Sequence, residues 1–357
     1  MAKFTRPSSS PLRPATCSLL LFAFCLALMA SKALLIRRKP PLPKPPSPAA
    51  PPRICDGDPY SQKRLAPAFT TPPPPTNYSR DFWGVVNFPP VPAFHINTHD
   101  PVRQDVFISG SVHGGREPWD RYIWDLLVRV LLPPSTSELV VDVGANVGYF
   151  TLMAAALGYD VVAIEPMGRN SAKLLASIAR NPGFDRRIRV VSAAASFRAG
   201  DVVSLGATHA TNQGNGRIGA HGEVCECWFS MVWLCLVTFE EQDHAVTVTL
   251  DDVVRQRNVA LMKIDVEGHE PAVLHGARHL LCHHTVRYVV IELSSMEEGS
   301  EGCSPRLMLE FMEAVGYAIS DVTPGAPRLM AAGASFPPNV LFTLADDALR
   351  RRACGDY

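Results

Sequence analysis

The feature that most constrains this chain is a strand that runs directly into a glycine turn and a helix, at Val140–Phe150 (VVDVGANVGYF). Gly144 and Gly148 flank the turn, where the missing Cβ allows positive φ and lets a ligand approach the backbone. A dinucleotide site would need G-x-G-x-x-G, but Asn146 and Tyr149 stand at the second and third glycine positions. The turn therefore favours a nucleoside-bearing cofactor without a pyrophosphate, whose amino-acid end packs against it.

Apolar strands alternate with helices from about Ala93 onward, which predicts an α/β, doubly wound, mostly parallel sheet covered on both faces. The expected strands are Leu139–Val143, Asp160–Ile164, Ile188–Ala195, Met262–Val266, Tyr288–Leu293, Tyr317–Val322 and Val340–Leu344. The expected helices are Trp119–Leu132, Tyr149–Leu157, Ser171–Arg180, Asp252–Arg257, Pro271–Leu281 and Met308–Val315.

Charged residues follow two of these strands. Glu165 ends the second strand, 23 residues after Asp142, and a carboxylate there can accept hydrogen bonds from both hydroxyls of a ribose. The block at 263–270 (KIDVEGHE) ends the fourth strand in a cluster of carboxylates. Because ligands bind at the carboxyl edge of open α/β sheets, we expect one pocket there beside a charged reaction centre.

The chain resembles the FkbM family of S-adenosylmethionine-dependent methyltransferases. The matching segments are, in order, VDVGANVGYFTL, VVAIEP, VTLDDVV, LMKIDVEGHEPAVLHGA and VVIELS, and the resemblance as a whole covers roughly Asp105 to Leu344. The KIDVEGHE block is highly specific, whereas many methyltransferases share the glycine turn. The resemblance implies a Rossmann-like class I methyltransferase sheet of seven strands with the last one antiparallel. It also implies S-adenosyl-L-methionine as cofactor and O-methylation of a sugar or another hydroxyl.

The resemblance further implies roles for individual residues. Glu165 would hold the ribose, Met167 would lie against the adenine, and the methionine part would be lined by Asp142, Gly144, Asn146 and Gly148. The acceptor pocket is expected to draw on Phe94–Arg121 and on the loops that follow the strands.

Methyl transfer requires an aligned acceptor oxygen and a group that removes its proton. Asp265 is best placed to face the cofactor, and histidine titrates near neutrality, which makes His269 a candidate general base. Glu267 and Glu292, each near a strand end, are expected to position a polyol or to serve as the base. Two blander interpretations stay open: His269 as an exposed loop histidine, and Glu270 as a residue that only favours the positive end of the next helix.

No metal is expected, although a divalent cation could bind the carboxylates, because these groups bind sugar hydroxyls equally well. His275 and His279 lie four residues apart without an H-E-x-x-H motif and are interpreted as a solvent-facing pair. Two other functions stay open. One is a membrane-anchored glycosyltransferase with Asp265 and Glu267 as a metal–nucleotide-sugar site. The other is a catalytically silent protein with the methyltransferase fold.

The N-terminal part is expected to be a membrane anchor on a stalk. Residues 1–14 form a basic tail. Ala15–Ser31 is apolar or small, and residues 15–36 are predicted to be a transmembrane signal anchor, with a cleavable signal peptide as the alternative. Residues 37–92 are assigned to a stalk, since 17 prolines between Pro40 and Pro92 favour extended polyproline. Asn77 begins an N-glycosylation sequon. We expect a single-pass membrane protein of the Golgi or secretory pathway with a lumenal catalytic domain at 93–357.

Charge and cysteine content exclude other classes of protein. The first 55 residues hold nine Lys or Arg and no acid, so the rest holds 25 of the 34 basic residues against all 34 acidic ones, a balance of −9. That sign argues against binding of nucleic acid. None of the nine cysteines forms a C-x-x-C pair, which argues against a zinc ribbon or a thioredoxin-like motif. Disulfides are possible in an oxidising compartment, but no pairing follows from the sequence.

One segment, 224–240, is anomalous. Val224–Phe239 (VCECWFSMVWLCLVTF) is strongly apolar, too short for an ordinary membrane span, and interrupts a region that otherwise looks like loop. A buried pair of strands is one interpretation. Our hypothesis is translated intron sequence or an aberrant gene model, and transcripts that mostly encode these residues would remove it.

Overall fold

The computed structural model describes residues 80–135, 137–209, 212–218, 243–255, 257–293, 305–321 and 339–354. All of them belong to the compact unit Ala50–Tyr357. The predicted basic tail, the anchor, the stalk up to residue 79 with its sequon, and segment 224–240 lie outside the described residues. Within the described ranges, none of the helices has the length and apolar character needed to cross a bilayer.

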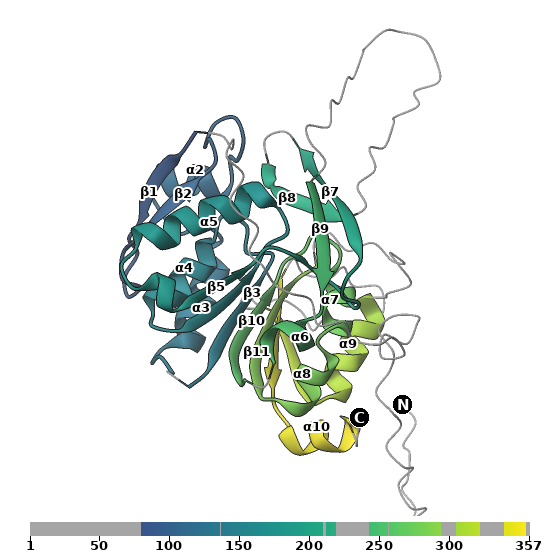
Figure 1. Ribbon diagram of the computed structural model, residues 1–357. Helices are drawn as coiled ribbons and strands as arrows, with labels where there is room; N and C mark the ends of the chain where they lie inside the picture. The colour runs from purple at the N-terminus through teal and green to yellow at the C-terminus, as the bar shows by residue number, and fades with distance from the viewer. Residues whose placement is uncertain are drawn as a thin grey trace, which may run out of the picture. The chain divides into compact units, whose positions relative to one another are not determined.

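The centre of the domain is a seven-stranded sheet with the order β12-β13-β11-β10-β3-β4-β5. Its strands are β3 (Leu139–Val143), β4 (Asp160–Ile164), β5 (Ile188–Val191), β10 (Val259–Ile264), β11 (Val286–Glu292), β12 (Tyr317–Asp321) and β13 (Asn339–Leu344). Strands β3, β10 and β11 lie side by side in Figure 1. Only β13 pairs antiparallel with its neighbours, β11 and β12. The predicted Rossmann-like sheet with an antiparallel last strand is therefore confirmed.

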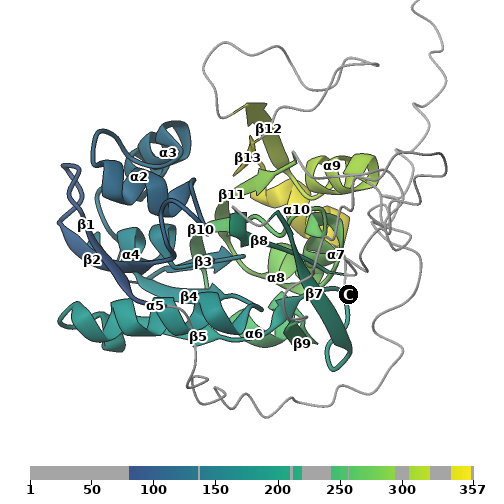
Figure 2. The ribbon, with the colours of Figure 1, turned by 90° about the horizontal axis from the view of Figure 1, so that it is seen from above.

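Helices cover both faces of this sheet (Figures 1 and 2). On one face, α3 (Arg121–Leu131), α4 (Tyr149–Ala156) and α5 (Gly168–Arg180) share a core with Val140 and Leu261. On the other, α6 (Leu250–Val254), α7 (Glu270–His275), α8 (Arg278–His283) and α9 (Pro305–Ala314) pack with Val141 and Met262. Successive residues of a strand point to opposite faces of the sheet. Because helices cover both faces, residues on each face must be apolar, which explains the continuous apolar runs.

An antiparallel hairpin of β1 (Phe82–Val86) and β2 (Phe94–Thr98) precedes the sheet, and α2 (Ile108–Gly114) follows it. Val86 and Val91 are buried in the core with α3 and α4. The predicted boundary between stalk and domain at residues 92 and 93 is therefore wrong, because residues 82–92 belong to the folded domain. Their prolines continue the composition of the stalk, but they lie in the connection between β1 and β2.

A second sheet has the order β6-β9-β7-β8. Its strands are β6 (Ala194–Ala195), β7 (Val202–His209), β8 (Asn212–Ile218) and β9 (Asp243–Val248). The predicted strand Ile188–Ala195 is thus divided between two sheets. The flanks of segment 224–240, interpreted as loop, are strands, since β8 ends before the segment and β9 follows it.

The predicted helix Pro271–Leu281 is two short helices, α7 and α8, with Gly276 between them. A Cβ at Gly276 would lie 2.1 Å from the carbonyl oxygen of Ser196, so the chain passes too close for any larger residue. The helix expected at Asp252–Arg257 begins earlier, as α6, because the Thr249 side chain accepts a hydrogen bond from the Asp252 backbone N–H. A short 3₁₀ helix, η2 (Phe184–Arg186), precedes β5.

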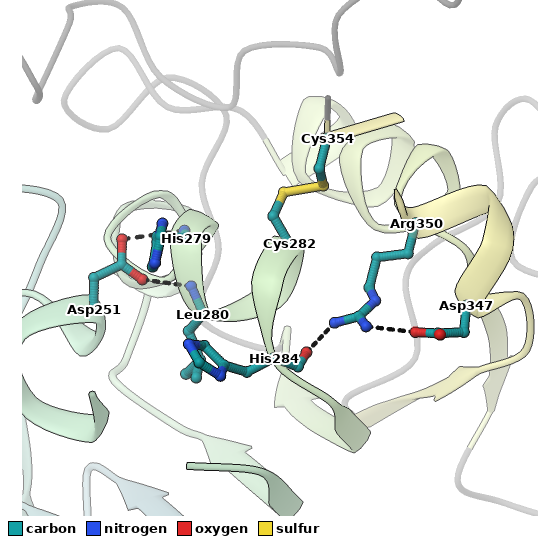
Figure 3. Close-up of a disulfide and its surroundings, with 8 residues drawn as sticks. All are labelled: Asp251, His279, Leu280, Cys282, His284, Asp347, Arg350 and Cys354. Carbon is teal, nitrogen blue, oxygen red and sulfur yellow. Dashed lines mark hydrogen bonds and ion pairs between the residues drawn. A yellow bond between two sulfur atoms is a disulfide. The ribbon is translucent and has the colours of Figure 1, made fainter. Parts of the chain in front are cut away.

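A disulfide joins Cys282 in α8 to Cys354 in the C-terminal helix α10 (Asp347–Cys354) (Figure 3). Both half-cystines are buried. Beside them, Arg350 donates a hydrogen bond to the carbonyl oxygen of His284 and forms an ion pair with Asp347 (Figure 3). The covalent bond and the arginine together hold α10 against α8.

We predict that the disulfide stabilises the domain by restricting the unfolded chain, because it closes a loop across a sequence separation of 72 residues. The double variant Cys282→Ala/Cys354→Ala should lose about 2–4 kcal/mol of unfolding free energy in urea titrations. A reductant should weaken the wild-type protein similarly and leave the variant unchanged. Free thiols at both positions in oxidised wild-type protein would contradict the prediction.

Candidate functional site

A cavity of about 360 Å³ opens at the carboxyl ends of β3, β4, β10 and β11. It contains residues from four of the five sequence blocks singled out above: Gly144 and Asn146, then Glu165, then Asp265 and Glu267, and also Glu292. The block VTLDDVV does not reach it. Parallel strands present their carboxyl ends at one edge, which brings these distant blocks together. The same six residues were predicted as site residues.

The glycine turn is built for close approach of two backbones. Gly144 has φ +79°, and a Cβ there would lie 1.8 Å from the carbonyl oxygen of Asp265. Asn146 has φ +53°, and its Oδ1 accepts a hydrogen bond from the Val147 N–H at 2.8 Å. The turn therefore presses against the start of the carboxylate loop and exposes its backbone to the cavity.

Gly148 and Asp142 do not line the cavity, in contrast to the prediction. Gly148 precedes α4 with φ +91°, and a Cβ there would meet Leu174 at 2.3 Å, so this glycine serves helix packing. Asp142 is buried behind the turn, where its Oδ2 accepts a hydrogen bond from Thr151 Oγ1 at 2.6 Å. Burial raises the pKa of Asp142. Both residues support the turn from behind.

Glu165 lies at the end of β4 and is held by three donors. Its carboxylate accepts hydrogen bonds from the backbone N–H groups of Asn146 (2.8 Å) and Met167 (2.9 Å) and from Asn170 Nδ2 (3.2 Å). Asn170 Oδ1 in turn hydrogen-bonds His99 Nε2 at 2.7 Å. Because a carboxylate has about four acceptor positions, one remains for a ligand. Burial raises the pKa of Glu165 to about 7.

A buried lysine, Lys263, organises the carboxylates. Its Nζ lies 2.8 Å from Asp265 Oδ2 and 5.1 Å from the centre of the Phe150 ring. Burial alone would lower the pKa of Lys263, but the carboxylates of Asp265 and Asp142 raise it above its ordinary value. Lys263 is therefore charged and fixes Asp265 at the cavity wall. We assigned it no role from the sequence, although a lysine within a buried strand signals a buried ion pair.

The loop after β10 turns sharply at Glu267 (φ +57°) and Gly268 (φ +102°). Glu270 Oε1 accepts hydrogen bonds from the backbone N–H groups of Val266 and Gly268, both at 3.1 Å. Burial raises the pKa of Glu270 to about 7. Glu270 therefore holds the loop in shape, a more specific role than the helix-end interaction considered above.

His269 and Met167 also lie outside the cavity lining. His269 is buried, not exposed, and its Nε2 is 3.0 Å from Ser196 Oγ. Because His269 contacts Ser196 and does not line the cavity, we do not assign it as the base. Met167 packs with Ala194 and beside Gly216, under the second sheet. His275, expected to face solvent, is buried and stacked on Phe197 at 6.0 Å.

The segment before β3 completes the cavity, as the expectation for Phe94–Arg121 predicted. It contributes Asp105, Phe107, Ile108, Trp119 and Asp120. Asp120 caps α3 with φ +42° and accepts a hydrogen bond from the Ile123 N–H. Phe107 and Trp119 meet edge to face, with ring centres 5.8 Å apart. No individual residue of this set could be predicted, because the segment carries no recognisable motif.

Across the parts of the chain that the structure describes, no group of three or more His, Cys, Asp or Glu side chains has the geometry to hold a metal ion. Lys263 already pairs with Asp265 in the one cluster where a cation was considered.

We predict that Gly144→Ala destabilises the domain by more than about 2 kcal/mol, since the new Cβ would overlap the Asp265 carbonyl and strain a positive φ. Gly183→Ala is the matched control, because Gly183 has φ +84° with no atom within 4 Å of the added Cβ. Its cost should be about 1 kcal/mol, that of the backbone conformation alone. Equal losses in urea unfolding would contradict the proposed close contact.

We predict that Glu165 makes the domain less stable as pH rises. Burial raises its pKa from 4.5 to about 7 in the folded state, so the unfolded chain ionises first and the free energy of unfolding falls between these values, by about 1–3 kcal/mol. Urea titrations at pH 5 and pH 8 should show a smaller fall for Glu165→Gln. Some pH dependence of the unfolding free energy should remain in this variant, because burial also raises the pKa of Glu270. Glu313→Gln changes an exposed carboxylate and is the control, which should behave like the wild type.

No curated protein matches this chain. Among solved structures, an assigned rRNA-methylase from Clostridium thermocellum matches with 8% identity and a TM-score of 0.34, over 63% of this chain and 97% of that one. Aeropyrum pernix fibrillarin with bound S-adenosyl-L-methionine matches with 13% identity and a TM-score of 0.32, over 73% and 92%. These likenesses are weak. Residues 142–319, however, match the model of the methyltransferase FkbM domain, and the chain belongs to that methyltransferase family.

Proposed function

We propose that this protein is an S-adenosylmethionine-dependent O-methyltransferase that acts on a hydroxyl of a glycan or a small hydroxylated acceptor. The observation that carries the proposal is the single cavity lined by Gly144, Glu165 and Asp265, which come from three separate sequence blocks. Membership of the methyltransferase family supports methyl transfer in general. The choice of a hydroxyl acceptor rests on the acidic side chains around the cavity.

The residues present fit such a cofactor. The exposed backbone of Gly144 and Asn146 would hold its amino-acid end, and the remaining acceptor position of Glu165 suits one ribose hydroxyl. Ile164, Ala194 and Ala195 give the cavity an apolar wall next to the ends of β4 and β5, against which a flat base can lie. We propose this wall in place of Met167 as the adenine contact.

When bound, the cofactor supplies an electrophilic methyl group on a sulfonium. The protein must then orient the acceptor oxygen and receive its proton. Asp265 is held by Lys263, which makes it suited to orient the acceptor. Glu267 and Glu292 also line the cavity, at the ends of β10 and β11, and either can receive the proton. His269 is not assigned this task, because its Nε2 is hydrogen-bonded with Ser196 Oγ.

We propose that the catalytic domain resides in the lumen of the Golgi or another secretory compartment, carried by the predicted membrane anchor. The Cys282–Cys354 disulfide supports this, since structural disulfides persist in oxidising compartments. The sequon at Asn77 is consistent with a lumenal stalk. Recovery of both cysteines as free thiols from cells that make the full chain would contradict a lumenal location.

The alternatives are less well supported. A glycosyltransferase would use Asp265 and Glu267 as a metal–nucleotide site, but Lys263 occupies that side of Asp265 with its own positive charge. Nucleic acid is not proposed as acceptor, because six carboxylates and a single lysine line the cavity. A catalytically silent protein would bind the cofactor without any transfer.

We predict that calorimetry will detect binding of S-adenosylmethionine, and that Glu165→Gln will weaken it roughly tenfold through loss of a charge-assisted hydrogen bond. Glu313→Gln is the control. Asp265→Asn should still bind the cofactor, more weakly than the wild type, but lose methyl transfer to a panel of glycans tested with labelled cofactor. Thermal stabilisation by nucleotide-sugars with manganese, and not by S-adenosylmethionine, would favour the glycosyltransferase. Binding without transfer to any acceptor would favour the silent protein.

A further inference from the structure

The cavity has two chemically different ends. Its apolar wall, Ile164, Ala194 and Ala195, lies at the ends of β4, β5 and β6. Its acids Asp265, Glu267 and Glu292 lie at the ends of β10 and β11, on the other side of β3 in the sheet. The strand order therefore separates a site for a flat base from an acidic end.

The acids at this end act on one another. The ammonium of Lys263 interacts electrostatically with the carboxylates of Asp265, Asp142 and Glu292. The carboxylate of Asp120 interacts in the same way with Lys263 and Asp265. Lys263 is the only basic residue among the described residues that line the cavity, and its Nζ is engaged by Asp265 at 2.8 Å. At the acidic end, one ammonium therefore faces the carboxylates of Asp265, Glu267 and Glu292, with Asp120 beside them. The acidic end is negative even after the ion pair is counted.

A negative, partly buried pocket responds to the charge of its ligand. The cofactor carries a positive sulfonium, whereas S-adenosylhomocysteine, which remains after transfer, has an uncharged thioether. In the reaction the acceptor oxygen forms a bond to the methyl carbon, the carbon–sulfur bond breaks with its electron pair on sulfur, and the acceptor proton leaves to a carboxylate. The ligand thus loses one positive charge while the pocket gains a proton.

We propose that the acidic end of this pocket binds the charged cofactor more tightly than its uncharged product, so that methyl transfer itself promotes product release. The inference rests on the proposed function and concerns the charge preference of the same site. Asp120 is the residue through which it is best tested. It lines the cavity but belongs to the helix cap of α3, outside the glycine turn and the carboxylate loop.

Asp120→Asn removes the charge and leaves the shape. Asparagine is as good a helix cap as aspartate and tolerates the positive φ of 42° at this position. Asp125→Asn is the matched control, because Asp125 lies on the same helix, pairs with Arg121 on the surface and does not line the cavity. Both variants lose one negative charge, so general effects of net charge cancel.

The experiment is calorimetric titration of the full-length protein with S-adenosylmethionine and, separately, with S-adenosylhomocysteine. We expect the wild type to bind the charged cofactor roughly tenfold more tightly, as expected for one unit charge near a negative, partly buried site. Asp120→Asn should reduce this preference about threefold, and Asp125→Asn should leave it unchanged. Glu292→Gln gives a second charge removal if Asp120→Asn does not fold. An analogue with an amine in place of the methylsulfonium should bind like the charged cofactor.

Equal or tighter binding of S-adenosylhomocysteine to the wild type would overturn the inference while leaving the proposed cofactor intact. An unchanged preference in both Asp120→Asn and Glu292→Gln would also overturn it, since the acids would then not be its source. Failure of both ligands to bind folded wild-type protein would instead refute the proposed function, on which the inference depends. The two failures are therefore distinguishable.

Discussion

The site depends on one contact, the passage of the Gly144 turn against the Asp265 carbonyl. Parallel pairing of β3 with β10 places Val143 opposite Ile264, so the two chains leave the sheet side by side. Only a glycine allows the turn to lie this close, with no room for a Cβ. The backbone amide of Asn146 is then in reach of Glu165, and Asp265 is in reach of Lys263. The contact between Gly144 and Asp265 therefore connects the proposed cofactor-binding residue Glu165 with the proposed reaction centre at Asp265.

Around this contact, the domain buries more charge than a core ordinarily tolerates. Asp142, Glu165, Lys263 and Glu270 are all buried. Each is accommodated differently: Asp142 by a hydroxyl, Glu165 by backbone and amide donors, Lys263 by a carboxylate, and Glu270 by loop N–H groups. Such groups lower stability unless they are paired, so their concentration at one strand edge is characteristic of a functional site. Hydrophobic layers on both faces and the disulfide at α10 provide the compensating stability.

The central sheet could be predicted well because each of its strands is marked by the apolar character of consecutive residues. Leu139–Val143 and Asp160–Ile164 are observed with the predicted bounds, since strands buried on both faces are continuous apolar runs. The small sheet was missed because β7 and β8 contain glycines and polar residues and therefore lack a continuous apolar run. The hairpin at 82–98 was partly missed because its prolines resemble those of the preceding stalk. The break at Gly276 depends on the approach of a distant segment, Ser196.

Taken by itself, the sequence determined the fold class, the family and the set of blocks that meet at the site, because apolar periodicity and contiguous motifs are properties of neighbouring residues. Gly144, Asn146, Glu165, Asp265, Glu267 and Glu292 could be selected on that basis. Only the tertiary structure decided which of the candidates face the cavity. His269 follows two residues with positive φ and contacts Ser196. Gly148 packs against Leu174, and Asp142 is hydrogen-bonded to Thr151 behind the glycine turn. The direction of a side chain after a turn depends on contacts with distant segments, and those contacts exist only once the chain has folded.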